Sequence, residues 1–307
     1  MPRLRGRSER RRPRFVKNPS SDERPLLVIS DLHLGRTDMI ASASKLDALV
    51  DGASTLIVNG DVAEMVHPEF SRIAHRELDA LHRRCLASGT RLVLLAGNHD
   101  PEIVARRHLV LAGGDVLLTH GDAVHEALAP WSDAAEVVAR RHREVIRSHS
   151  ESDRETLDVL FEACRKAALA ETESPEGMVM PTTPFSALAK PWKVARILGF
   201  WMSHARRLDR FANQFQPSAR IVIAGHSHRG GVERIGDRTI INTGCFGVPG
   251  PALGVIIGAD GLEVHRIVGS RRNGTWSMDP RAVHVEPGIH VRPGEIPEGD
   301  LPRRHAS

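Results

Sequence analysis

The chain has 307 residues, of which 41% are hydrophobic and 26% charged, with a formal net charge of +4. No run of about 18 apolar residues is present, which excludes a membrane-spanning helix. Its three cysteines (Cys85, Cys164 and Cys245) are too few and odd in number for a disulfide framework, and they form no CxxC pair that would suggest a structural zinc site. We expect a cytoplasmic protein in a reducing compartment, without a secretory leader.

The net charge is unevenly distributed. Residues 1–17 hold eight Lys or Arg and one acid, so this segment carries +7 and the remainder of the chain −3. Residues 1–22 are therefore predicted to be a disordered basic tail, which could touch nucleic acid or anionic lipid. Because the body is slightly acidic, no obligate nucleic-acid partner is expected.

The first part of the chain alternates strands with helices. Apolar runs predict buried strands at residues 26–30, 55–59, 91–96 and 116–119. Helical spacing of apolar residues predicts helices at 41–50 and 68–87. This order is typical of βαβ units and of a parallel sheet covered on both faces, so the fold class is α/β.

The apolar residues of segment 125–216 recur with helical periodicity, which predicts a helical insertion. Ser152 and Glu155 match a capping box before an apolar run. The insertion holds eight of the twelve aromatic residues, namely Trp131, Phe161, Phe185, Trp192, Phe200, Trp201, Phe211 and Phe215. These rings either form the core of the insertion or offer an apolar surface to a lipid or a membrane.

Strands resume after the insertion, at residues 221–224, 231–235, 238–244 and 252–267. Asp260-Gly261 divides the last run and predicts a hairpin. From about residue 271 the chain is rich in Pro, Gly and Arg and is predicted to be weakly structured. The main domain is thus expected to span residues 23–270, with the insertion at about 125–216 and a tail at 271–307.

Metal-binding side chains follow the predicted strands. They are Asp31 and His33, then Asp61, then Asn98 with His99 and Asp100, then His120, and finally His226 and His228. In open α/β sheets, sites form at the carboxyl ends of strands. In Asp31-Leu32-His33 and His226-Ser227-His228 the i, i+2 spacing on an extended backbone would point both side chains into one cavity.

The residue types suit two divalent cations. Mn, Fe and Zn all accept mixed oxygen and imidazole ligands, and Mn is the metal we expect. A pair of ions about 3.5–4 Å apart needs a bridging carboxylate. Asp61, which follows a Gly after the second strand, is the candidate bridge.

The pattern D-x-H, G-D, G-N-H-[DE], lone His and G-H-x-H resembles the calcineurin-like metallophosphoesterase family, from Asp31 to His228. The resemblance implies a sandwich of two mixed β-sheets flanked by helices, here with a helical cap insertion. It also implies the ligand sets: Asp31, His33 and His228 for one ion, Asn98, His120 and His226 for the other, with Asp61 between them.

The resemblance further implies that His99 is not a ligand. His99 would donate a proton to the leaving group or hold a phosphate oxygen, and Asp100 would orient it. The implied reaction is hydrolysis of a phosphate mono- or diester by attack of a metal-bridging hydroxide. The resemblance does not assign the substrate.

Two alternatives remain open. The long helical insertion before His226 resembles the layout of the UDP-2,3-diacylglucosamine hydrolase branch, which cleaves a lipid-linked pyrophosphate. That branch has Arg where this chain has His99, which favours a simpler phosphoester. A substrate that is lipid-linked would agree with peripheral membrane contact through the insertion. The other alternative is a scaffold of the same fold without catalytic activity.

Overall fold

The computed structural model describes residues 24–40, 42–174, 191–269 and 274–300. The predicted basic tail and the middle of the insertion lie outside these ranges. The helices are α1 (Asp47–Asp51), α2 (Pro68–Ala87), α3 (Ala135–Ser148), α4 (Leu157–Glu173) and α6 (Pro191–Phe215). Short 3₁₀ turns are η2 (Ala43–Leu46), η3 (Ala112–Gly114), η4 (Asp122–Val124) and η5 (Pro293–Glu295).

Two mixed sheets form the centre of the fold. The six-stranded sheet has the order β11 (Ser277–Pro287), β10 (Gly261–Val268), β9 (Leu253–Gly258), β1 (Leu26–Ile29), β2 (Thr55–Asn59), β3 (Arg91–Leu95). The five-stranded sheet has the order β4 (His108–Leu111), β5 (Val116–Thr119), β6 (Ile221–Ala224), β8 (Arg238–Asn242), β7 (Gly231–Ile235). The α/β fold predicted from the sequence, with two mixed sheets flanked by helices, is confirmed.

Parallel pairing brings the strand ends together. β1, β2 and β3 run parallel in the first sheet, and β5, β6 and β8 run parallel in the second. Every residue of β1, β2, β5, β6 and β8 is buried, as expected for strands covered on both faces. The carboxyl ends of both parallel sets therefore lie at one end of the sandwich.

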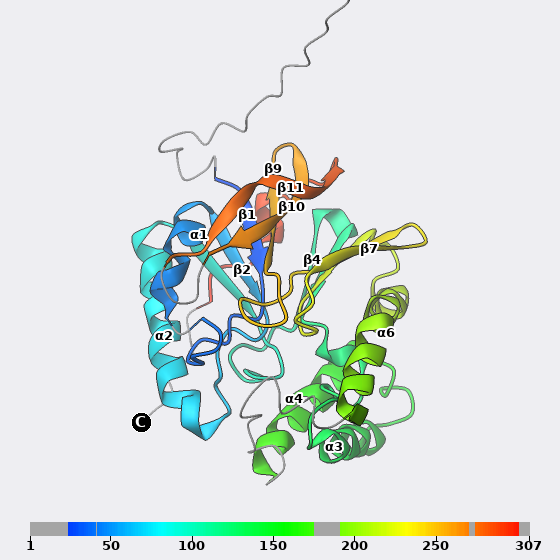
Figure 1. The fold of residues 1–307 in the computed structure, drawn as a ribbon. Helices are drawn as coiled ribbons and strands as arrows, with labels where there is room; N and C mark the ends of the chain where they lie inside the picture. Colours follow the sequence, from blue (N-terminus) through cyan, green and yellow to red (C-terminus); the bar gives the residue numbers. More distant parts are fainter. Residues whose placement is uncertain (1–23, 41, 175–190, 270–273, 301–307) are drawn as a thin grey trace, which may run out of the picture.

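Three apolar layers hold the sandwich together. Side chains such as Val28, Ile57 and Ile223 pack between the sheets. Neighbouring residues on the same strands, such as Ile29, point the other way into the layer beneath α1 and α2. Helices α3, α4 and α6 gather beside the second sheet, away from α1 and α2 (Figure 1).

Several local expectations differ from the structure. Residues from 271 on include β11, which pairs with β10, although Pro280 and Pro287 obscure its pattern in the sequence. Helix α4 is capped by Thr156, whose side chain accepts from the amide of Val159, and the Ser152 capping box is not formed. The sequence pattern does not predict strand β4, which is short and only partly buried. The hairpin at Asp260-Gly261 is present between β9 and β10.

The end of the described chain is bound to the sheets. The carboxylate of Asp300 accepts hydrogen bonds from the amide of Leu94 (3.0 Å) and from Arg106 Nη1 (2.6 Å). The carboxylate of Glu295 accepts from the amides of Ala112 (2.9 Å) and Gly113 (2.7 Å). These charge-assisted bonds hold residues 295–300 against the sheets, and β11 pairs with β10, contrary to the weakly structured tail predicted there.

Candidate metal centre

The predicted ligands meet at one end of the sandwich. Each of them follows a parallel strand: β1, β2, β3, β5 or β6. Three groups of side chains among the described residues are each close enough to hold a metal ion; one of them is His33, Glu64 and His99, and the other two consist of predicted ligands alone. Of these two, the first is Asp31, His33, Asp61 and His228, and the second is Asp61, His120 and His226.

The first group surrounds a small polar space. Nε2 of His33 lies 3.0 Å from Nε2 of His228, and Nε2 of His228 lies 3.3 Å from Oδ1 of Asp31. Nδ1 of His33 contacts a carboxylate, so its proton belongs on Nδ1 and Nε2 offers a lone pair. Imidazole lone pairs and carboxylate oxygens so close together are a donor set for a divalent cation.

The second group shares a carboxylate with the first. Oδ2 of Asp61 lies 3.2 Å from Nε2 of His120 and 3.7 Å from Nε2 of His33. Oδ1 of Asn98 is buried and has no hydrogen-bond partner among the described residues, and Nε2 of His120, also buried, lies beside this carboxylate without hydrogen-bond geometry. Buried polar atoms are rarely left unpaired, so both are suited to bind a cation.

Other hydrogen bonds orient the candidate ligands. Nδ1 of His120 donates to the carbonyl of Asn59 (3.1 Å), and Nε2 of His226 donates to the carbonyl of Leu128 (3.1 Å). Asp31 accepts from Ser30 and from the amide of His226. Such partners fix the ring orientation and leave the other nitrogen of each imidazole available to a metal.

The ligand backbones are left-handed rather than extended. Asp31, His33, Asp61, His226 and His228 have φ between 46° and 66°. The i, i+2 pairs therefore face one space because the chain turns after each strand, and the extended geometry expected from the sequence is wrong. Non-glycine residues in this conformation cost about 1–3 kcal/mol each where strained, and they cluster at functional sites.

Glycines beside the ligands allow close approach. A Cβ atom at Gly97 would overlap Oδ1 and the amide nitrogen of Asp61. A Cβ atom at Gly225 would overlap Oδ2 of Asp31 and the hydroxyl of Ser30. The glycines that precede Asn98 and His226 are thus required by the carboxylates packed against them.

Charges within the cluster shift the pKa values of its members. Burial would raise the pKa of Asp61, but His120, His99 and His33 together hold it well below its usual range. Burial would lower the pKa of His120, but the Asp61 carboxylate raises it to about 10. Burial and the charge of His120 lower the pKa of His226 to about 4. The cluster thus combines ionised carboxylates with a neutral imidazole at His226.

His99 lies at the mouth of the cluster. Its side chain is 34% exposed, more than that of any other candidate site residue. Its amide donates to Oδ1 of Asp61 (3.0 Å). Burial would lower the pKa of His99, but the charges of Glu64 and Asp61 raise it to about 9.

Glu64 is a site residue that the sequence did not reveal. Its carboxylate is 3% exposed and accepts from Nδ1 of His33 and Nδ1 of His99, each at 2.9 Å. Arg36 Nη1 also donates to it at 3.2 Å. The only sequence signal is an acidic residue in the apolar run Val62-Ala63-Glu64-Met65, which suggests a buried charge that needs partners.

Asp100 is placed differently from the prediction. It is fully buried, and its carboxylate accepts from the amides of Gly97 (2.7 Å), Val62 (2.6 Å) and Ala63 (3.3 Å). None of these bonds reaches His99, whose ring is oriented by Glu64 instead. Asp100 therefore ties the turn after β3 to the turn after β2, because a carboxylate can satisfy several amides at once.

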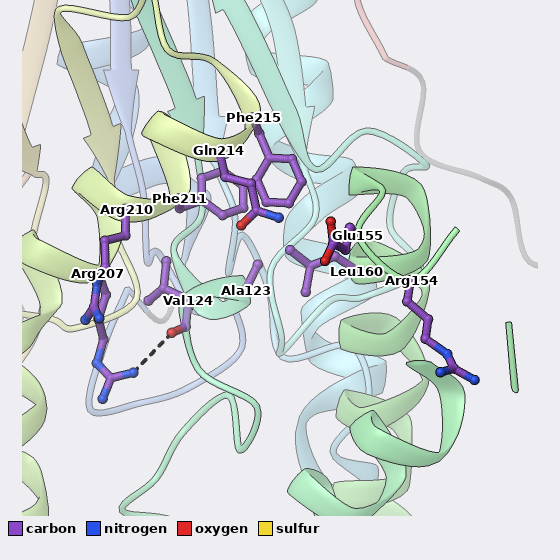
Figure 2. A pocket seen from close by; sticks show the side chains of 10 residues that line it. All are labelled: Ala123, Val124, Arg154, Glu155, Leu160, Arg207, Arg210, Phe211, Gln214 and Phe215. Carbon is purple, nitrogen blue, oxygen red and sulfur yellow. Dashed lines mark hydrogen bonds between the residues drawn. The ribbon is translucent and has the colours of Figure 1, made fainter. Parts of the chain in front are cut away.

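The helical insertion forms a cavity of its own. A cavity of about 340 Å³ lies between η4, the start of α4 and α6 (Figure 2). Apolar side chains of Leu160, Phe211 and Phe215 line it together with the guanidinium groups of Arg207 and Arg210. Its lining includes none of the predicted metal ligands, so this cavity is separate from the candidate metal centre.

Within the described residues, no helix combines the length and the apolar character needed to cross a membrane.

No curated protein is significantly similar to the chain in sequence. Several solved structures match the chain at low identity and with TM-scores below 0.5. A predicted phosphoesterase from Streptococcus pneumoniae TIGR4, described as conserved and uncharacterised, has 16% identity and a TM-score of 0.34, with 83% of this chain and 97% of that chain covered.

Two further structures are similar at the same level. Wild-type Vps29 from Entamoeba histolytica, complexed with Zn²⁺, has 14% identity and a TM-score of 0.39, with 83% of this chain and 97% of that chain covered. The cold-active protein-tyrosine phosphatase of a psychrophilic Shewanella species has 12% identity and a TM-score of 0.37, with 83% and 80% covered.

The family assignment comes from sequence. The profile of the calcineurin-like phosphoesterase family matches residues 24–230, which include every predicted ligand. Six of these ligands, namely Asp31, His33, Asp61, His120, His226 and His228, form the convergent cluster described above. The chain therefore belongs to the calcineurin-like phosphoesterase family.

Proposed function

We propose that the chain is a binuclear metal-dependent phosphoesterase that hydrolyses a phosphate mono- or diester. One observation carries the proposal: two ligand groups share the carboxylate of Asp61. Asp31, His33 and His228 would hold one ion, and Asn98, His120 and His226 the other. Manganese is the metal we propose, and iron or zinc would suit the same donors.

The bound ions would supply a nucleophile from water at neutral pH and neutralise charge on the phosphate. Residues of the chain would position the ions and supply a proton. Asp61 fixes the position of the two ligand groups relative to each other, since its Oδ2 faces both of them. His99, protonated and partly exposed, can give a proton from its ring to the departing oxygen.

Glu64 supports this role of His99. Because the Glu64 carboxylate occupies Nδ1 of His99, Nε2 is the ring nitrogen that would give its proton to the leaving group. The same carboxylate fixes His33, so the proton donor and a metal ligand share one anchor. Asp100 contributes by holding the turns that present Asp61 and Asn98.

A substrate panel tests the proposal. Metal-free protein reloaded with Mn²⁺ would be assayed with an aryl phosphate monoester, an aryl diester, a cyclic nucleotide and UDP-diacylglucosamine. Hydrolysis of a mono- or diester, lost in Asp61→Asn, is the expected result. Binding of metal without turnover of any of the four would instead indicate a scaffold of the same fold.

One observation favours the lipid-linked pyrophosphate as a second candidate substrate. Helix α6 exposes Trp192 (47%), Leu198 (47%) and Met202 (71%) within the insertion. An apolar surface on a helix with basic neighbours suits contact with acyl chains or with a membrane interface. Faster turnover of UDP-diacylglucosamine than of the aryl esters would select this candidate.

A further inference from the structure

The loop that carries His226 and His228 is held by the helical insertion as well as by the sheet. Trp201, on α6, donates from its indole Nε1 to the carbonyl of Ser227 at 2.9 Å. The carbonyl of Leu128, between η4 and α3, accepts from Nε2 of His226 at 3.1 Å. Two separate parts of the insertion therefore bond to two consecutive residues, His226 and Ser227, in the segment that carries both candidate ligands.

Aromatic rings of the insertion also pack on this loop. The ring centroids of Trp131 and Phe200 lie 5.6 Å and 5.8 Å from that of His226, and 5.0 Å from each other. The guanidinium carbon of Arg229, next to His228, lies 6.0 Å from the ring centroid of Trp201. These contacts restrict how the His226 ring and the loop can turn.

The loop needs such restraint because its backbone is unusual. His226 and His228 both adopt left-handed φ angles, 66° and 58°. Ser227, between them, is 5% exposed, so water cannot replace the hydrogen bond that the indole of Trp201 donates to its carbonyl. A single side chain from the insertion thus satisfies the one carbonyl that separates the two ligands.

We propose that Trp201 is a positioning residue of the metal centre, whose indole holds the Ser227 carbonyl so that His226 and His228 keep the backbone needed for coordination. The inference rests on the proposed function only in requiring that metal binds. It makes the insertion a structural part of the centre, in addition to any role in contacting substrate.

Trp201→Phe tests the inference because it removes the donor and keeps an aromatic ring. Trp192→Phe is the matched control, nine residues earlier on the same helix, where the side chain is 47% exposed. Metal-free full-length protein would be titrated with Mn²⁺ by calorimetry and with Co²⁺ by visible absorption. The unfolding temperature of each metal-free variant would be measured alongside.

We expect Trp201→Phe to weaken the binding of at least one Mn²⁺ ion by about tenfold, because losing a hydrogen bond that supports a metal site typically costs this much affinity. The Co²⁺ spectrum should change as well. Trp192→Phe should match the wild type in both. Unchanged affinities and spectrum in Trp201→Phe would overturn the inference while leaving the proposed function intact. A lower unfolding temperature without a change in affinity would overturn it too, by assigning the bond to folding alone. Failure of the wild type to take up Mn²⁺ would remove both proposals.

Discussion

The carboxylate of Glu64 lies 2.9 Å from Nδ1 of His99 and, through its other oxygen, 2.9 Å from Nδ1 of His33. One buried anion thus orients a candidate ligand and a candidate proton donor. The two imidazoles stand nearly perpendicular, at 79°, with ring centroids 4.8 Å apart. The carboxylate also favours the protonated form of His99, which a general acid requires.

Glu64→Gln should lower turnover by about 10- to 100-fold, because a neutral amide holds the protonated His99 less well and loosens His33. The loss should be larger for an ester with a poor leaving group than for a 4-nitrophenyl ester, which departs without a proton. Glu69→Gln, in the first turn of α2, is the control and should match the wild type. Equal losses on both esters would assign Glu64 to metal binding alone.

The pH dependence should report on His99. Its pKa is raised to about 9, so the proton is present at neutral pH and is lost as pH rises through that value. Bound cations would neutralise Asp61 and repel a protonated imidazole, so in the metal-loaded enzyme this pKa lies lower. For a poor leaving group, kcat should therefore fall as pH rises, at or below about pH 9, and His99→Asn should remove most of this decline together with roughly 10²–10⁴ of the rate. The measurement is a pH–rate profile of both proteins. A His99→Asn enzyme with wild-type turnover would exclude His99 from the reaction.

The same shift affects the stability of the metal-free protein. Because the folded pKa of His99 exceeds the unfolded value of 6.5, its contribution is complete below pH 6.5 and is lost between 6.5 and about 9. Urea unfolding of the metal-free protein at pH 6 and pH 9.5 should show a smaller drop in His99→Asn than in the wild type. A drop of the same size in both would show that His99 is not the group that titrates.

Metal loading should stabilise the fold. Ions that bind the folded state only, at 100 times their Kd, add about 2.7 kcal/mol per site, or about 5–10 °C in unfolding temperature for a domain of this size. Thermal unfolding before and after chelation and Mn²⁺ return is the measurement. Asp61→Asn should show little of this shift, since both groups use Asp61. A full shift in Asp61→Asn would contradict the shared bridge.

The convergence of the candidate ligands follows from the sequence more directly than the placement of their neighbours, for a physical reason. Ligands such as Asp31 and His226 directly follow buried apolar strands, so local pattern and the rules of parallel sheets suffice to bring them together. Glu64 and His99 meet only through the pairing of β2 with β3, 35 residues apart. No local pattern separates a carboxylate that will face His99 from one, such as Asp100, that will bind backbone amides.

The limits of the fold prediction are of the same kind. Strand β4 is short and half-buried, and it exists because its residues pair with β5. Strand β11 carries two prolines and becomes a strand only at the edge of the sheet beside β10, where a missing amide is tolerated. Both elements depend on tertiary pairing, which composition does not encode.

Gly97→Ala tests the packing that brings Asp61 to the centre. A methyl group there would overlap Oδ1 and the amide nitrogen of Asp61, so the shared carboxylate must move. We expect a loss of about 1–3 kcal/mol in stability, as for overpacked sites, together with weaker Mn²⁺ binding. The matched control is Gly199→Ala on α6, where a Cβ atom meets nothing within 4 Å and the change should stabilise the helix by roughly 0.5–1 kcal/mol. Because backbone and carboxylate are both in contact with the added methyl, a Gly97→Ala protein with wild-type Mn²⁺ affinity would show that Asp61 does not bridge the two groups.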